Sequence, residues 1–97
     1  MATYITLINL TEQGVKTIKD LPARLAAGRQ AMEANGGKLL QYYLTLGAQD
    51  AVVVYEFPDD ETVASMALAQ AGLGNIRTTS MRAFTEAEIP GILSKMP

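Results

Sequence analysis

The chain has 97 residues, 48% of them hydrophobic, with 8 basic and 10 acidic side chains and a net charge of −2. It contains no His, Cys or Trp, which excludes a His-based triad, a Cys nucleophile, a zinc site and His- or Cys-ligated haem. The basic residues are scattered, so no nucleic-acid partner is expected. No signal peptide or membrane-spanning stretch is recognisable. We expect a cytoplasmic protein that uses no metal and no cofactor.

The first third of the chain predicts a strand followed by a helix. Residues 4–10 are rich in β-branched and aromatic side chains, which favour a strand. Apolar or small residues then recur at spacings of three and four, the pattern of one helix face: Ile18, Leu21, Leu25, Gly28 and Met32. Pro22 suits a first helical turn, so the main helix is predicted to start there, after a short turn at 15–19. It is predicted to end at 36–37, two glycines.

Two strands follow, over residues 39–46 and 51–57, joined by a hairpin turn at 47–50. In this turn Gly47 and Asp50 are the expected turn residues, with the carboxylate of Asp50 accepting hydrogen bonds from N–H groups of the turn.

The last third predicts helix, strand and a short helix. Residues 58–61, Pro-Asp-Asp-Glu, open a helix with an Asp cap and acidic side chains near the positive end of its dipole, which accounts for them without a metal. Glycines at 72 and 74 end it. Residues 75–84 form the fourth strand, and 85–96 a short final helix with Pro90 in its first turn.

The predicted order, βαββαβ with a C-terminal helix, is typical of a single ferredoxin-like α+β domain spanning residues 1–97. Right-handed crossovers place both long helices on one face of a four-stranded antiparallel sheet and leave the other face uncovered. The third strand is nevertheless apolar on both sides, which an uncovered face would not require. We therefore expect a homodimer in which two sheets pack face to face.

The second strand alternates between the two faces of the sheet. We expect one set of its residues to face the helices: Leu40, Tyr42, Leu44 and Leu46. The other set is expected on the uncovered face: Leu39, Gln41, Tyr43 and Thr45.

Nearly the whole chain resembles the GYD-domain family, small bacterial and archaeal members of the dimeric α/β-barrel superfamily. The segments that carry the resemblance are 4–7 (YITL), 13–24 (QGVKTIKDLPAR), 36–38 (GGK), 43–47 (YLTLG), 57–60 (FPDD), 74–79 (GNIRTT) and 81–84 (MRAF). The chain keeps Gly47 and Asp50 of the family's name-giving pattern but has Gln49 where Tyr is expected. The resemblance implies a ferredoxin-like fold and a dimeric barrel, and no established activity.

The resemblance implies a lumen lined by the sheet. In relatives of the superfamily this lumen holds haem, quinone-like substrates, lactones or amino-acid effectors. The polar residues that could reach such a lumen here are Tyr43, Thr45, Glu56, Arg77, Thr79 and Arg82. A carboxylate near an Arg could act as a base only if desolvation outweighed the effect of the Arg on its pKa. The alternative is that Glu56 is solvated or ion-paired at a strand end and that the tyrosines pack in the core or an interface.

Three function classes stay open on the sequence alone. The first is a homodimer with a small-molecule-binding or structural role for the lumen. The second is a cofactor-independent monooxygenase or isomerase acting on a small organic substrate. The third is a protein-interaction module. A lumen of roughly 300 Å³ or more that contained Tyr43 with Glu56 or an Arg would favour a ligand site.

Overall fold

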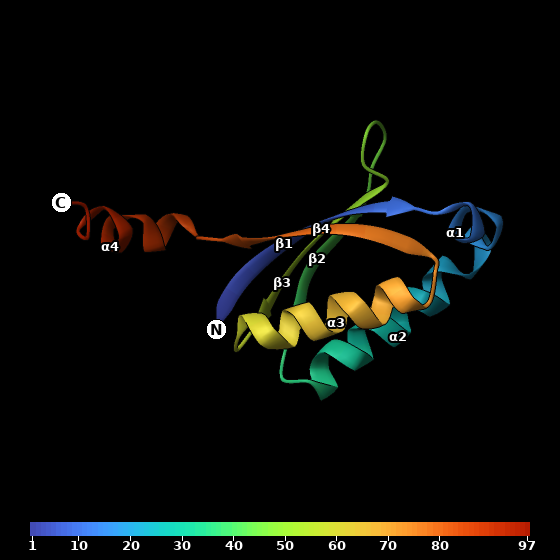
Figure 1. Ribbon diagram of the computed structural model, residues 1–97, viewed down its shortest axis with the longest axis horizontal. Helices are drawn as coiled ribbons and strands as arrows, with labels where there is room; N and C mark the ends of the chain where they lie inside the picture. Colours follow the sequence, from blue (N-terminus) through green and yellow to red (C-terminus); the bar gives the residue numbers. More distant parts are fainter.

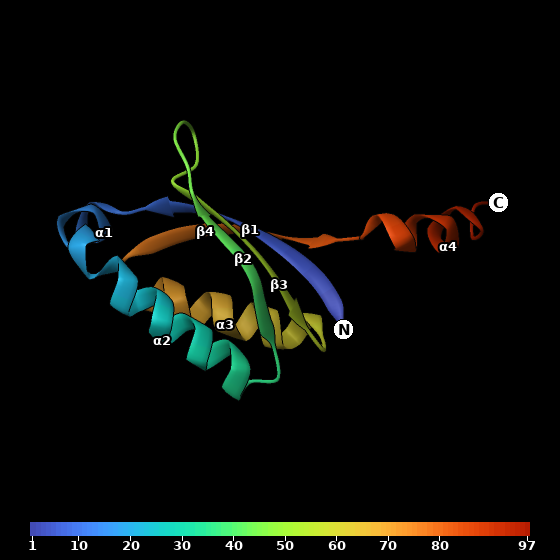
Figure 2. The same cartoon turned by 180° about the vertical axis from the view of Figure 1, so that it is seen from behind.

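The computed structural model describes all 97 residues, Met1 to Pro97, as a curved sheet with two long helices against one face (Figures 1 and 2). The elements are β1 (Ala2–Leu10), α1 (Glu12–Lys16), η1 (Ile18–Asp20), α2 (Leu21–Ala34), β2 (Lys38–Leu44), β3 (Ala51–Phe57), α3 (Asp60–Gly72), β4 (Ile76–Ala83), η2 (Glu86–Glu88) and α4 (Ile89–Leu93). The strands are antiparallel in the order β2-β3-β1-β4. The predicted ferredoxin-like fold is confirmed. None of the helices combines the length and hydropathy that crossing a membrane requires.

Local sequence signals account for the helix ends. Thr11 caps α1, its hydroxyl accepting a hydrogen bond from the N–H of Gly14 at 3.1 Å. Asp59 caps α3 by accepting from the N–H of Thr62 at 2.7 Å, and this hydrogen bond lowers the pKa of the Asp59 carboxyl. Beyond α2, Gly36 has a φ of 83°, which a residue with a side chain rarely adopts.

The core lies between the two central strands and the helices. Its buried members are Tyr4, Ile8, Ala51, Val53, Tyr55, Phe57 and Val63. Phe57 is completely buried, and its ring meets that of Tyr55 edge to face at 5.8 Å. Six of these seven residues come from β1 and β3, which lie in the middle of the sheet. Val63 is the only one of these core residues that comes from a helix, so few helix side chains fill the space between the helices and the sheet.

The face assignment of β2 differs from the prediction because the strand is irregular. Its pairing with β3 shifts between Leu39 and Gln41, which places one extra residue, Leu40, in the strand. As a result Leu39 packs against the core with Tyr42, whereas Leu40 is exposed. The expectation that Leu39 lies on the uncovered face was therefore wrong, and so was the inward assignment of Leu40. The strand also ends at Leu44, which leaves Leu46 fully exposed in the following loop.

The hairpin between β2 and β3 is longer than the predicted four-residue turn. It runs over residues 45–50 and projects beyond the sheet in Figure 1. Gly47 has a φ of 108° and sits in this loop as expected. The Asp50 carboxylate, however, accepts from the N–H of Leu10 at 2.8 Å, and the N–H of Asp50 donates to the carbonyl of Ile8. The carboxylate of Asp50 thus fastens the hairpin to the end of β1, and the loop itself is closed by the Asp50 carbonyl, which accepts from the N–H of Thr45 at 2.9 Å.

Candidate functional site

The side of the sheet that faces away from α2 and α3, here called the open face, is apolar at its centre. On β1 the buried residues alternate with Ile5 and Leu7, which therefore point to the open face. On β3 the same alternation places Val52 and Val54 there, and the register pairs Ile5 with Val54 and Leu7 with Val52. These four side chains form one continuous apolar patch across the two central strands. No element of the chain covers it (Figures 1 and 2).

Four of the six predicted lumen residues lie on the open face, but only Arg77 and Thr79 are neighbours there. The four are Tyr43, Glu56, Arg77 and Thr79. The partner of Tyr43 in β3 lies four positions from Glu56, a separation of roughly 13 Å. Along β1, the register positions of Glu56 and Arg77 are six residues apart, roughly 20 Å. No ion pair joins Glu56 to an Arg, so these groups do not converge on one reaction centre within the chain.

The other two predicted residues have local structural partners. Thr45 lies in the hairpin loop, where its hydroxyl donates to the carbonyl of Gln49 at 2.6 Å. Arg82 is paired with Tyr4 in the register, so it lies on the helix-bearing side of the sheet and not on the open face.

Arg82 fastens the beginning of the C-terminal segment to the sheet. Its Nη1 donates to the carbonyl of Thr3 at 3.1 Å, and its Cζ lies 4.4 Å from the centre of the Phe84 ring. Its Nη2 is 3.6 Å from Oε2 of Glu88. Glu88 also accepts from the N–H and hydroxyl of Thr85 in a capping box, and these hydrogen bonds, with the charge of Arg82, lower the pKa of the Glu88 carboxyl. The direction in which the segment leaves the sheet is therefore defined.

The segment from Phe84 to Pro97, here called the C-terminal arm, extends away from the body of the molecule. In Figure 1 it continues the line of β4 and ends far from α2 and α3. Several apolar side chains of the arm are exposed: Phe84, Ile89, Ile92, Leu93 and Met96. Ile89, Ile92 and Leu93 lie on α4 at the spacing i, i+3 and i+4, which is the spacing of anchors on one side of a helix that enters an apolar groove. Met96 follows the end of α4, because this helix ends at Leu93 and not at residue 96 as predicted.

The hydroxyl of Tyr4 has a strongly raised pKa. Its buried hydroxyl donates to Oδ1 of Asp60, and this bond, with burial and the negative charge of Asp60, raises the pKa of Tyr4 to about 12. Because the folded-state pKa lies above the unfolded value of about 10, the contribution to stability is complete below pH 10 and is lost as the pH rises towards 12.

We expect a titration followed at 295 nm to contain one tyrosine component near pH 12 that is absent from Tyr4→Phe. The urea midpoint of the unmodified chain should fall between pH 10 and pH 12 more steeply than that of Tyr4→Phe. If the two chains lost stability in parallel over this range, the hydrogen bond to Asp60 would not be the cause of the shift.

Sequence reasoning missed two features of the surface. The arm was expected as a short helix, but nothing in the sequence placed it away from the body; the one available signal was that its apolar residues had no assigned partner. The continuous patch on the open face depends on which residues of β1 and β3 pair, and the sequence shows only the alternation within each strand.

Comparison with known proteins places the chain in a family. Residues 4–93 match the GYD domain. The chain belongs to the GYD domain family. The "Glutamine synthetase and cystathionine beta-lyase binding protein" of Thermus thermophilus is 33% identical over 90 residues, which cover 92% of this chain and 95% of that protein. The crystal structure of TTHA0845 from the same organism superposes with a TM-score of 0.54 at 21% identity, over 88% of this chain and 95% of that one, a likeness of fold.

Proposed function

We propose that this GYD-domain protein is a homodimeric binding module that holds other proteins through its C-terminal arm. The observation that carries the proposal is the arm itself, which extends clear of the body (Figure 1). On its helix α4, Ile89, Ile92 and Leu93 are exposed at the spacing i, i+3 and i+4. A further support is the name of the relative from Thermus thermophilus, which describes a protein that binds two metabolic enzymes.

The dimer part of the proposal rests on the open face. Ile5, Leu7, Val52 and Val54 are half-buried by their neighbours and carry no covering layer in the single chain. Tyr43 and Met81 extend the apolar surface outward, with 54% and 40% of their surfaces exposed. A second sheet packed face to face removes this area from water, and each Å² of apolar surface so buried contributes about 25 cal/mol. Such a dimer would present two arms.

The spread of the polar residues supports a binding module over an enzyme. A cofactor-independent monooxygenase or isomerase needs a base and an anion-stabilising group on one substrate. Glu56 and Arg77 are instead roughly 20 Å apart along one sheet. A cavity of about 390 Å³ lies on the helix side of the sheet and is lined by none of the six predicted residues. A second, shallower pocket is lined by Arg77 but by none of the other five.

The arm is testable with a matched pair of substitutions. We expect Leu93→Ser to weaken binding to a partner enzyme at least about tenfold, since an apolar anchor in a groove contributes roughly 1.5–3 kcal/mol. Leu68→Ser removes an equally large exposed side chain from α3, remote from the arm, and is expected to leave binding unchanged. The measurement is biolayer interferometry against purified glutamine synthetase and cystathionine beta-lyase from the organism that encodes this chain.

Two outcomes would contradict the proposal. One is that neither enzyme binds the unmodified chain at micromolar concentration. The other is that Leu68→Ser and Leu93→Ser weaken binding equally, which would mean that the arm is not the contact. Sedimentation of both variants checks that any loss does not come from dissociation of the dimer.

A further inference from the structure

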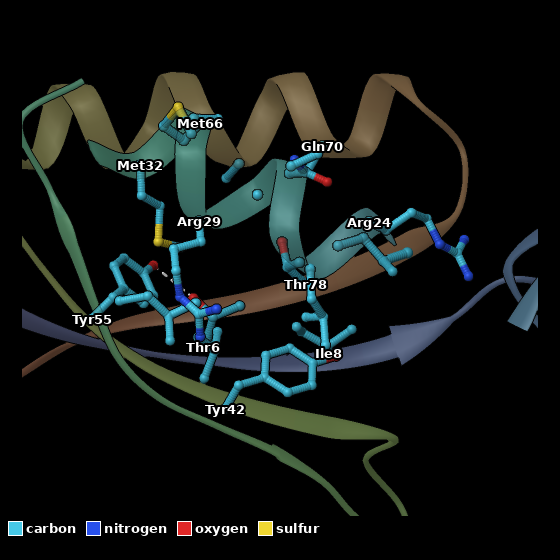
Figure 3. Close-up of a pocket in the computed structure, with 18 of the residues that line it drawn as sticks. Thr6, Ile8, Arg24, Arg29, Met32, Tyr42, Tyr55, Met66, Gln70 and Thr78 are labelled. Carbon is cyan, nitrogen blue, oxygen red and sulfur yellow. Dashed lines mark hydrogen bonds between the residues drawn. The ribbon is translucent and has the colours of Figure 1, made fainter. Parts of the chain in front are cut away.

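A cavity of about 390 Å³ lies between the sheet and the two long helices (Figure 3). This volume is within the range of pockets that hold small ligands. It is distinct from the open face, because β1 and β3 contribute to it their inward residues, such as Ile8 and Val53, and not Ile5 or Val54. The protein-binding role proposed above does not use it.

The cavity exists because the helices present small residues to the sheet. Gly28, Ala27 and Ala31 of α2 and Ala67 of α3 line it. A Cβ built on Gly28 meets no atom within 4 Å, so a position on the sheet-facing stripe of α2 is left without any filling side chain. Tightly packed cores rarely leave such space, and its lining forfeits contacts that a ligand could restore.

Three hydroxyl groups on the sheet side of the cavity form a hydrogen-bonded row, in which one O–H has no acceptor. Ser80 Oγ and Thr6 Oγ1 are 2.8 Å apart. Thr6 Oγ1 and Tyr55 Oη, which Figure 3 shows, are 2.7 Å apart. Thr6 and Tyr55 are each only 5% exposed. Three hydroxyls supply three protons, and the two hydrogen bonds of the row take up two of them. One donor is therefore left over for an acceptor, and the three residues all line the cavity.

The charged residues of the cavity wall are all positive. Arg24 and Arg29 line it, and no Asp or Glu does, although acidic residues outnumber basic ones in the whole chain. Arg24 Nη2 donates to the carbonyl of Thr17 at 3.1 Å, but its buried Nε has no hydrogen-bond partner. In Figure 3 the Arg29 side chain extends from α2 in the direction of the sheet, while the Arg24 guanidinium points away from the other labelled residues. Its bond to Thr17 places it at the start of η1.

We propose that this cavity binds a small carboxylate with an apolar aliphatic or aromatic body. The apolar body fills the space over Gly28, and the carboxylate pairs with Arg29 and accepts a hydrogen bond from the spare hydroxyl proton. Such a ligand would also join α2 to the sheet, because it contacts both, and so would stabilise the folded chain by linkage.

The probe for this proposal is octanoate, with 1-octanol as its uncharged counterpart. We expect isothermal titration calorimetry of the full chain to show saturable octanoate binding and at least tenfold weaker binding of octanol. Methyl NMR spectra should shift at Ile8 and Val53, which line the cavity, and not at Ile5 and Val54, which lie on the same strands but face the other way.

Two pairs of variants locate the site. Gly28→Leu should fill the space and lower octanoate affinity at least tenfold, whereas Gly72→Leu, at a helical glycine with equal room outside the cavity, should change it less than twofold. Arg29→Gln removes an exposed positive charge and should weaken octanoate but not octanol. Far-UV circular dichroism confirms that each variant is folded.

The proposal is overturned if octanoate does not bind, if octanol binds as tightly, or if Gly28→Leu binds octanoate like the unmodified chain. It is also overturned if the NMR shifts fall on Ile5 and Val54, because the ligand would then occupy the open face.

Discussion

Replacing Val54 by Lys is expected to dissociate the proposed homodimer, weakening self-association at least about 100-fold, or about 2.7 kcal/mol. Val54 lies on β3, near the middle of the open face, where the register pairs it with Ile5 and Gln41. In a face-to-face dimer the two introduced ammonium groups would be withdrawn from water near the centre of the interface, and desolvating a charge costs several kcal/mol, more than an ion pair with Glu56 two residues away would return. In a monomer the same side chain reaches water, so the folded chain should tolerate it.

The measurement is sedimentation equilibrium of both chains over a range of micromolar concentrations. Ala64→Lys adds the same charge to an exposed position of α3 and is expected to leave the association unchanged. A stable monomer of the unmodified chain at micromolar concentration would remove the dimer from the proposal. Equal association of Val54→Lys and Ala64→Lys would place the interface on another surface.

The second large effect is expected at Gly14. A Cβ at this position would lie 2.1 Å from the carbonyl oxygen of Asn75. That oxygen cannot easily move, because it accepts from the N–H of Thr11 at 3.0 Å, and the Thr11 hydroxyl donates to the carbonyl of Gly74 at 2.6 Å. Gly14→Ala must therefore break the junction between the start of α1 and the loop before β4. We expect a loss of about 3 kcal/mol in the free energy of unfolding.

Gly28→Ala is the matched control. Both glycines lie in helices, but the Cβ at Gly28 meets open space. There the change should stabilise the chain by up to about 1 kcal/mol, since alanine favours the helix over glycine by that amount. Urea unfolding of the three chains followed by circular dichroism gives both values. If Gly14→Ala were as stable as the unmodified chain, the contact between α1 and Asn75 would not be part of the folded state in solution.

The order of elements was predictable because each carries its own local signal. Thr11 and Asp59 cap helices, Pro22 sits in the first turn of α2, and Gly36 follows its end. These effects act over three or four residues, so they can be recognised without knowing the tertiary structure. The same holds for the β-branched and aromatic residues of β1 and β3, which favour strands. Family membership was also predictable, because the matching segments extend along nearly the whole chain.

The candidate sites were less predictable because they depend on pairing. The shift between Leu39 and Gln41 reverses the expected faces of Leu39 and Leu40, and it arises only where β2 meets β3. Arg82 was grouped with Tyr43, yet register places it opposite Tyr4, where it holds the arm. The cavity over Gly28 could not be predicted either. A glycine on the apolar face of a helix suggests close packing against a neighbouring element, and only the position of the sheet shows that the space is open.

The sequence by itself determined which segments form strands and helices, that one face of the sheet has no helix to cover it, and that the chain has no His or Cys chemistry. Only the tertiary structure decided how far apart Glu56 and Arg77 lie, which way the arm leaves the sheet, and where space remains under α2. The physical reason is the distance along the chain over which the interactions act. Capping, turn formation and alternation are interactions between near neighbours in the chain, whereas distance, direction and unfilled volume are properties of strands and helices packed against one another.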